Sequence, residues 1–536
     1  MTAQNLFAIF LQHSGSGAVC WMYMTRKLSY LVYGLALLKF GLPFLLQNHV
    51  YEPHRDEFLY LAEARHMAWG YLEVPPLMSA MAYLSNLAGA GLFWIRLWPS
   101  LFGALTYVIV GRLILHLGGK GFAVVLGFLP FVFGYFMHVH FIFQPNFLEV
   151  FFWTVMAYGL IRHIQTGKPR GLYITGIGLG LGMMSKYSVA FYFISLMVGL
   201  LLTPERKLFR NRHFYFALLL SLVIILPNLI WQAVHGFPLL YHMKALQDQQ
   251  LAKVSRFGFL RDQLLFNLPG LFLWLAGLYW SFFSPYRFVC WATLIVLAFL
   301  TLAHGKGYYG MGAYPILFAM GSFALTRWTS HPGRYAMVAY CVVTGLFIDT
   351  IAIPFLPPER LAAFYASHPI FRRLGFLQWE DQKDHPLPQD FADMLGWKEM
   401  TERIAGVYDS LSPSERAQAV LDCDNYGEDG AVDYYGPAFH LPPAIGHAAS
   451  YLFWTPPDSF RGDVFILTTD ARDEIHADFM KEFRSVSLAD SIINPYAREF
   501  GSYIILLKGP SDHFRKVWWD YYESLQKETS VYRLSH

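Results

Sequence analysis

The 536-residue sequence predicts a polytopic α-helical membrane protein with a small α/β domain at its C-terminal end. The chain is 55% hydrophobic and only 15% charged, whereas soluble chains are about 25% charged. Long apolar runs recur as far as residue 355, and from Pro357 onward the composition becomes that of a soluble domain. The net charge of +3 gives no indication of a nucleic-acid partner.

The apolar runs predict the number of membrane spans. A bilayer core about 30 Å thick requires roughly 20 mostly apolar residues per helix. Suitable runs centre near residues 38, 105, 130, 155, 178, 195, 222, 275, 295, 318 and 343, which predicts about eleven spans. The shorter run from Leu77 to Ala90 predicts a juxtamembrane helix. No cleavable signal peptide is evident, so the run Tyr30 to Leu46 is expected to be a signal anchor.

The charges of the loops predict the orientation. Alternate loops, such as RHIQTGKPRG and TPERKLFRNRH, are short and basic, which places them in the cytoplasm by the positive-inside rule. The remaining loops mix acids, histidines and aromatic residues and fall on the outer face. We therefore expect three parts: a cytoplasmic segment 1–27, a transmembrane domain 28–355 and an outer domain 356–536.

The outer domain shows the alternation of strands and helices expected of an α/β fold. The segments AQAVLDC, DVFILTT and SYIILLKG are short, apolar and typical of buried strands. DMLGWKEMTERIAGVYDSL has helical spacing of its apolar residues and is followed by Ser-Pro, which predicts a helix that ends there.

The stretch HRDEFLYLAEARHMAWGYLEVPPL, residues 54–77, concentrates ionisable side chains directly after the first span. Pro53 before it and Gly70 within it predict a helix between these two residues. Helical spacing would place four side chains on one stripe. They are Asp56, Tyr60, Glu63 and Met67.

The acid pair Asp56 and Glu57 has two readings. In the simpler one, the acids of an interfacial helix only complement the helix dipole. However, paired acids at the mouth of a span are costly unless they face a wet, protein-lined cavity. A carboxylate held there is suited to act as a general base on a hydroxyl group.

Cations also collect in the outer loops, where they predict an anionic ligand at the outer leaflet. They are Lys186, Lys253, Arg256, Arg261 and Lys306, the last beside Tyr308 and Tyr309. Lys186 alone could equally extend its amine to the membrane interface. Glu73 precedes a Pro-Pro turn, and His235 and His242 follow the seventh span. Each of the three is either part of a functional site or an ordinary polar residue of a loop.

Several motifs together resemble the protein-O-mannosyltransferase-like family of bacteria. YEPHRDEFLYLAEARHMAWGYLEVPPL is similar to the first-loop signature of that family. Further similar segments are QPNFLEVFFW, GLGLGMMSKYS, LPNLIWQAVHGFP, HGKGYYGMGAYP, NYGEDGAVDYYGP and GHAASYLFWTPP. The chain therefore resembles a GT-C-type glycosyltransferase, a family that includes the transferase adding aminoarabinose to lipid A.

The resemblance implies a fold, an activity and a site. Enzymes of this family transfer a sugar, with inversion, from a polyprenyl-phosphate carrier to a hydroxyl or phosphate acceptor at the outer leaflet. It implies Asp56 and Glu57 as catalytic residues, with Asp56 as the general base. The five outer cations would bind the donor phosphate. The substrate pocket would contain Tyr60, Glu63, Tyr308 and Tyr309.

The resemblance also implies a divalent metal ion, Zn, Mg or Mn. The aminoarabinose transferase has Glu-Lys-Pro-Pro-Leu, in which the glutamate helps to bind the metal and the lysine contacts the phosphate. Here Glu73 is kept but Val74 replaces the lysine, which shifts the expected phosphate contact to Lys186 and the cations that follow it. His242 is the expected second metal ligand, with His235 as the alternative.

We therefore expect a glycosyltransferase, adding a hexose or pentose, in the inner membrane of a bacterium, with a cytoplasmic N-terminus and a periplasmic C-terminal domain. The expected acceptor is a cell-envelope lipid or glycan such as lipid A or lipopolysaccharide, and a protein acceptor is the alternative. A transporter or flippase of a lipid-linked solute is less favoured. It should show matched halves and ionisable groups near mid-membrane, neither of which is evident.

Overall fold

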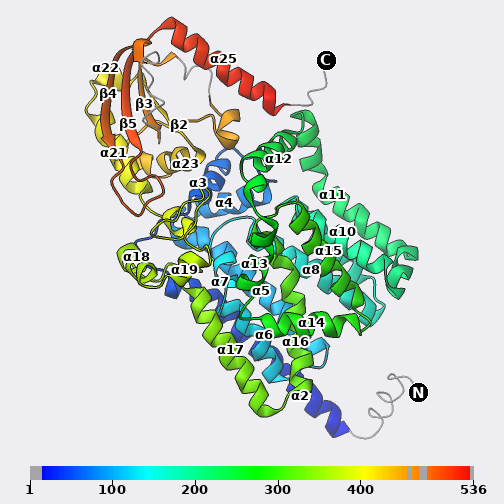
Figure 1. The fold of residues 1–536 in the computed structure, drawn as a ribbon. Helices are drawn as coiled ribbons and strands as arrows, with labels where there is room; N and C mark the ends of the chain where they lie inside the picture. Colours follow the sequence, from blue (N-terminus) through cyan, green and yellow to red (C-terminus); the bar gives the residue numbers. More distant parts are fainter. Residues whose placement is uncertain (1–14, 456–460, 470–479, 531–536) are drawn as a thin grey trace.

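A computed structural model describes residues 15–455, 461–469 and 480–530 (Figure 1). Parts of the expected segment 1–27 and of the expected domain 356–536 lie outside these residues. Helices up to α17 form an elongated body, and a small sheet lies at one end of it. The last helix, α25 (Asp512–Thr529), runs from the sheet back to α12 (Pro238–Gln249) of the body.

All eleven apolar runs identified in the sequence centre on helices of the body. These are α2 (Gly15–Leu46), α5 (Leu92–His116), α6 (Gly121–Val132), α8 (Asn146–Thr166), α9 (Arg170–Met183), α10 (Val189–Leu201), α11 (Arg212–Val234), α14 (Leu271–Phe282), α15 (Arg287–Leu302), α16 (Tyr314–Trp328) and α17 (His331–Asp349). Among the described residues, four helices can cross a membrane by length and composition, or six if two bent pairs count as spans. A multi-pass membrane protein is confirmed, and the number of eleven spans stays a prediction.

Glycines allow the closest helix contacts inside the body. A Cβ atom on Gly277 of α14 would lie 2.2 Å from the carbonyl oxygen of Leu317 in α16. A Cβ atom on Gly321 of α16 would lie 1.8 Å from the carbonyl oxygen of Leu273 in α14. Small residues at helix crossings are typical of membrane proteins, where close van der Waals packing replaces the hydrophobic effect.

The segment between α2 and α5 contains two short helices, α3 (Arg55–Glu63) and α4 (Leu77–Leu87). The expected extension of α3 toward Gly70 is wrong, because α3 ends at Glu63. The Tyr71 hydroxyl donates to the carbonyl oxygen of Glu63 at 3.1 Å and accepts the N–H of Ala68 at 3.0 Å. It thereby satisfies the backbone groups that a longer helix would have paired. Met67 consequently lies outside the stripe and is 49% exposed.

Other short elements connect the longer helices and lead to the sheet. They are α7 (Phe136–Val139), η1 (Pro204–Arg210), η2 (Leu251–Lys253), α13 (Arg256–Phe266), η3 (Gly307–Ala313), α18 (Pro358–Ser367), α19 (Ile370–Arg373) and α20 (Gln389–Ala392). Leu361 of α18 and Phe391 of α20 are buried in one apolar cluster with Met137 and Phe141 of the body. The chain that follows α17 therefore packs on α7 and the loop after it before it enters the sheet.

The C-terminal sheet has five strands in the order β2-β1-β3-β5-β4. The strands are β1 (Ala419–Asp422), β2 (Ala444–Ile445), β3 (Val464–Thr469), β4 (Phe483–Ser491) and β5 (Tyr503–Pro510). β1 pairs in parallel with β2 and β3, whereas β5 runs antiparallel to β3 and β4. The predicted strands at β1, β3 and β5 are confirmed.

Helices join and cover these strands. They are α21 (Trp397–Asp409), α22 (Pro413–Arg416), α23 (Tyr426–Tyr435), η4 (Gly436–Phe439) and η5 (Ala449–Phe453). The predicted helix is confirmed as α21. The sheet's core includes Phe58 of α3, so the opening helix of the body and the C-terminal domain share one apolar cluster.

Candidate active site

Asp56 lies in the first turn of α3 and is partly buried between two parts of the chain. Its Oδ2 atom accepts a hydrogen bond from Gln144 Nε2 at 2.8 Å. Its Oδ1 atom accepts a hydrogen bond from the hydroxyl of Tyr426 at 2.8 Å. Gln144 belongs to the loop between α7 and α8, and Tyr426 is the first residue of α23 in the C-terminal domain. Both oxygens of the expected base are therefore held in place.

A chain of amides connects Asp56 to Lys186. Gln144 Oε1 accepts from Asn146 Nδ2 at 3.1 Å, and Asn146 Oδ1 accepts from Lys186 Nζ at 2.8 Å. A lysine amine can only donate and an ionised carboxylate can only accept, so both amides are oriented by the ends of the chain. Every donor then points from the cation toward the carboxylate, an arrangement in which each bond strengthens the next.

Lys186 lies in the turn between α9 and α10 and is enclosed by acidic and aromatic groups. Its Nζ also donates to Glu149 Oε2 at 2.7 Å and lies 4.4 Å from the ring centre of Tyr309. Tyr308 is slightly farther, at 5.8 Å. The amine has three N–H donors, and Asn146 and Glu149 use two. One remains for a ligand such as a phosphate oxygen.

The other expected phosphate-binding cations are arranged differently. Lys306 Nζ pairs with Glu380 Oε1 at 3.0 Å, and Arg261 pairs with its neighbour Asp262 at 2.9 Å. Lys253 and Arg256 are exposed. Of the five cations, Lys186 is the one that a described chain of hydrogen bonds joins to Asp56.

Glu57, expected beside Asp56 in catalysis, is fully buried and its oxygens serve the backbone. Oε1 accepts the N–H of Phe143 at 2.8 Å, and Oε2 accepts the N–H of His54 at 2.8 Å as part of a capping box. Arg96 Nη2 lies 3.8 Å from Oε2. These contacts give Glu57 the position of a structural residue that joins α3 to the loop containing Gln144.

Glu63 and Glu73 form a second acidic centre beside Tyr60. Glu63 Oε2 accepts from the hydroxyl of Ser79 at 2.5 Å, and Glu73 Oε2 accepts from the hydroxyl of Ser450 at 2.7 Å. The other oxygen of each acid is buried without a hydrogen-bond partner among the described residues. Burial raises the pKa of Glu73 to about 7, and burial together with neighbouring Glu73 holds the pKa of Glu63 well above its usual range.

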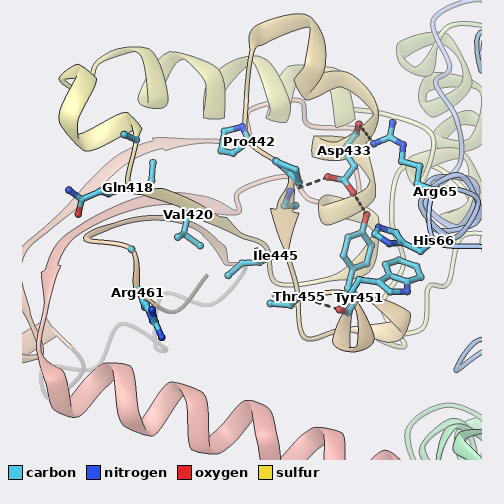
Figure 2. Close-up of a pocket in the computed structure, with 16 residues that line it drawn as sticks. Arg65, His66, Gln418, Val420, Asp433, Pro442, Ile445, Tyr451, Thr455 and Arg461 are labelled. Carbon is cyan, nitrogen blue, oxygen red and sulfur yellow. Dashed lines mark hydrogen bonds between the residues drawn. The ribbon is translucent and has the colours of Figure 1, made fainter. Parts of the chain in front are cut away.

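A cavity of about 620 Å³ lies beyond the end of α3, between α23 and the strands β1 and β2. Figure 2 shows Arg65 and Tyr451 pointing toward Asp433 at its edge. The carboxylate of Asp433 accepts from the Tyr451 hydroxyl at 2.9 Å and from the N–H of Ala444 at 3.0 Å. Asp56 does not line this cavity.

Comparison with known proteins identifies the fold. Residues 73–231 match the family model described as dolichyl-phosphate-mannose-protein mannosyltransferase. The structure of ArnT from Cupriavidus metallidurans bound to undecaprenyl phosphate superposes with a TM-score of 0.58 over 92% of this chain and 98% of that chain, at 15% identity. The chain has the GT-C fold of membrane glycosyltransferases.

Two further solved structures match the chain. ArnT in the apo state matches with a TM-score of 0.58 over 91% of this chain and 98% of that one, at 14% identity. The oligosaccharyltransferase of Archaeoglobus fulgidus tethered to an acceptor peptide has a TM-score of 0.42, at 14% identity over 78% of this chain and 64% of that one. No curated protein matches the sequence.

Among the described residues of this GT-C chain, one group of three has the composition and spacing of a metal site: His54, Asp390 and Asp393. His54 Nδ1 accepts the N–H of Asp56 at 3.1 Å, so the proton of a neutral ring lies on Nε2. Nε2 lies 3.6 Å from Asp390 and 3.7 Å from Asp393. A ligand needs a free lone pair at that atom. With its proton on Nε2, the ring lies beyond hydrogen-bond distance of both carboxylates and offers no lone pair there, so in this tautomer the three residues do not hold a metal ion.

The unpartnered oxygens of Glu63 and Glu73 fit a divalent ion better, because carboxylate and hydroxyl oxygens suit Mg²⁺ or Mn²⁺. The expected ligand His242 lies on α12 and His235 at the end of α11, where its ring stacks on Trp231 at 4.1 Å. Neither belongs to a described group of three potential metal ligands.

Sequence reasoning missed the partners of Asp56 and Lys186. Gln144, Asn146 and Glu149 lie in the motif QPNFLEVFFW, where three polar residues precede an apolar run. Their spacing could have identified them, because a glutamate inside a membrane helix is costly unless it is paired. Tyr426 had no comparable signal beyond its place in the motif NYGEDGAVDYYGP.

Proposed function

We propose that this protein is a glycosyltransferase that uses a polyprenyl-phosphate-linked sugar as donor. It acts at the outer face of a bacterial inner membrane, with the N-terminus in the cytoplasm and the C-terminal domain in the periplasm. The acceptor is a hydroxyl or phosphate group of a cell-envelope lipid or glycan such as lipid A. The observation that supports this proposal most strongly is the hydrogen-bond chain from Asp56 to Lys186.

The reaction needs a base and a cation at opposite sides of the anomeric carbon. Asp56 takes the proton of the acceptor hydroxyl, whose oxygen forms a bond to the anomeric carbon while the bond from that carbon to the phosphate oxygen breaks. Attack opposite the leaving phosphate inverts the configuration. Lys186 donates to the phosphate, which leaves as polyprenyl phosphate with additional negative charge.

Lys186 is suited to this role by its surroundings. Glu149 and Asn146 hold the amine in one position, so little reorganisation is needed when the phosphate gains charge. The rings of Tyr308 and Tyr309 lie 5.8 and 4.4 Å from the amine, where their faces attract its positive charge. A divalent ion at Glu63 and Glu73 would supply Lewis-acid stabilisation of negative charge.

Radiolabel transfer from a polyprenyl-phosphate sugar in isolated membranes tests the proposal. Asp56→Asn keeps the size of the side chain and removes the base, so we expect the rate of transfer to fall by about 10²- to 10⁴-fold. Asp381→Asn is the matched control, because Asp381 is an exposed acid of the outer segment that pairs only with surface groups. Full activity of folded Asp56→Asn protein would remove Asp56 from the mechanism.

A protein acceptor is the second candidate, and the family model matched by residues 73–231 supports it. The same assay distinguishes the two. Label that partitions with extracted lipid supports the lipid acceptor, whereas label that becomes soluble only after proteolysis supports a protein acceptor.

A further inference from the structure

We propose that the C-terminal domain supplies part of the active site: Tyr426 is a positioning residue that orients the carboxylate of Asp56. This inference rests on the proposed role of Asp56 as the base. Its basis is the 2.8 Å hydrogen bond from the Tyr426 hydroxyl to Asp56 Oδ1. The two residues are 370 positions apart in the chain.

Tyr426 is itself held in one place. The guanidinium carbon of Arg55 lies 4.5 Å from the centre of its ring, a cation–π contact. Arg55 Nε also donates to Asn425 Oδ1 at 3.3 Å, and Asn425 caps the start of α23. Burial and the neighbouring Asp56 hold the pKa of Tyr426 well above its usual range, so the phenol keeps its proton and donates it.

Two glycines bring α23 into direct contact with α3. A Cβ atom on Gly427 would lie 2.4 Å from Arg55 Cγ, and one on Gly430 would lie 2.7 Å from Phe58 Cβ. The second glycine also faces the backbone carbonyl of Phe58 at 3.2 Å. Only glycine at these positions lets the backbone of α23 approach close enough for Tyr426 to reach Asp56.

The far end of α23 is attached to the same segment of the body. Arg65 Nη1 donates to the carbonyl oxygen of Asp433 at 2.9 Å, and Figure 2 shows this contact beside the Tyr451–Asp433 hydrogen bond. The helix is therefore fixed to α3 at its first residue and, near its last, to Arg65 just beyond the end of α3. Such double attachment determines both the distance and the rotation of Tyr426 relative to Asp56.

Tyr426 fixes the orientation of the Asp56 carboxylate, which Gln144 alone does not fully determine. Gln144 holds one carboxylate oxygen, about which the group could still rotate. A second donor on the other oxygen fixes the plane of the carboxylate, and a general base must lie within hydrogen-bond reach of the proton it removes. Hydrogen bonds to the ionised form also favour that form.

Tyr426→Phe tests the inference, with Tyr434→Phe as the matched control. Tyr434 lies on the same helix and packs on Phe58, but its hydroxyl donates to the carbonyl oxygen of Ala90 at 2.8 Å. For Tyr426→Phe we expect kcat to fall about tenfold, because a hydrogen bond to a charged group is lost. KM for the donor stays nearly constant. The fall in kcat at nearly constant KM distinguishes a role in orienting the base from a role in binding the donor.

A purely structural role for Tyr426 would lower the amount of folded protein and leave the kcat of the folded fraction unchanged. We therefore normalise rates to folded protein, and an unchanged kcat for Tyr426→Phe would overturn the inference. Gly430→Ala is a second variant, because the added methyl group must push α23 away from Phe58; we expect it to reproduce the loss of kcat. Normal activity of folded Gly430→Ala would also count against the inference.

Asp56→Asn in the same membranes separates this inference from the proposed function. If Asp56→Asn is inactive and Tyr426→Phe behaves like the unchanged protein, the base stands and the role of Tyr426 is wrong. If Asp56→Asn is as active as the unchanged protein, the proposed function itself is wrong.

Discussion

Asp56 is supported from two sides, and the two supports differ in kind. On the side of the membrane body, Gln144 and Asn146 lead to the charged amine of Lys186. On the side of the C-terminal domain, Tyr426 is a neutral donor on a docked helix. The first support connects the base to the charge that a donor phosphate would meet, whereas the second supplies orientation only. Loss of charge and loss of orientation should therefore be separable by experiment.

The largest effect is expected at the charged end of the body support. Lys186→Met should lower kcat/KM by about 10²- to 10³-fold, because a donor to the departing phosphate is lost. The change also leaves Glu149 buried without its cation, which destabilises the fold.

The double variant Lys186→Met/Glu149→Gln therefore provides the control. It restores thermal stability without restoring transfer, measured by melting in detergent and by the radiolabel assay. Recovery of activity in the double variant would contradict a role for Lys186 in catalysis.

Next in size is the stability of the docked domain. Phe58 is fully buried and touches the rings of Trp397, Tyr434 and Tyr435. Phe58→Ala should cost about 3–5 kcal/mol of packing at this junction. Limited proteolysis then cleaves the C-terminal domain faster, while Phe257→Ala, which alters a side chain that is 78% exposed, leaves the rate unchanged. Equal rates for the two variants would show that the junction contributes little.

A smaller effect tests whether the two supports act independently. Gln144→Leu removes the donor to Asp56 Oδ2 and should lower kcat about tenfold. Combined with Tyr426→Phe, the two losses should multiply to about 100-fold if each support acts on its own oxygen. The four rates form a double-mutant cycle. A combined loss no greater than either single loss would mean that both supports serve one function.

The smallest effect concerns pH and the second acidic centre. In protein kept metal-free by a chelator, burial raises the pKa of Glu73 from its usual 4.5 to about 7. Between these values the folded chain holds more protons than the unfolded chain, so stability falls as pH rises through this window. Glu73→Gln removes this titration, and its gain in Tm over the unchanged protein should grow by roughly 2–4 °C from about pH 5 to about pH 8.

Glu402→Gln controls for the loss of a carboxylate at the surface, because Glu402 is 49% exposed. Its effect on Tm should be the same at both pH values. A gain for Glu73→Gln that is equally independent of pH would show that Glu73 ionises normally.

Sequence patterns predicted the helices and strands whose positions depend on local composition. The helices of the body and three of the strands follow apolar runs, and the runs centre on the elements found. The position of Asp56 just after α2 follows from the acids that come directly after the first apolar run. Glu57 is also an acid directly after the first apolar run, but it is buried. Its side chain accepts the backbone N–H of His54 because His54 is the residue that precedes the helix, and the sequence pattern did not identify that residue.

Local sequence patterns did not predict the contacts between segments that are distant in the chain. The Tyr71 hydroxyl ends α3 early by satisfying the carbonyl oxygen of Glu63, a turn geometry that helical periodicity does not encode. Gln144 lies 88 positions from Asp56. Tyr426 meets Asp56 only because two glycines let separate parts of the fold approach closely. Charge and hydropathy single out the polar residues around Gln144 as candidates, but they do not show that Gln144 or Tyr426 meets Asp56.

The 370 positions between Asp56 and Tyr426 have a consequence during synthesis. The ribosome produces Asp56 early, whereas Tyr426 follows after every helix of the body has been made. Domains fold largely in the order of their synthesis, so a growing chain contains Asp56 and Gln144 before it contains the second donor. The fully oriented carboxylate therefore arises only when the C-terminal domain has folded and docked on α3, and an activity that depends on this orientation would begin only when the molecule is nearly complete.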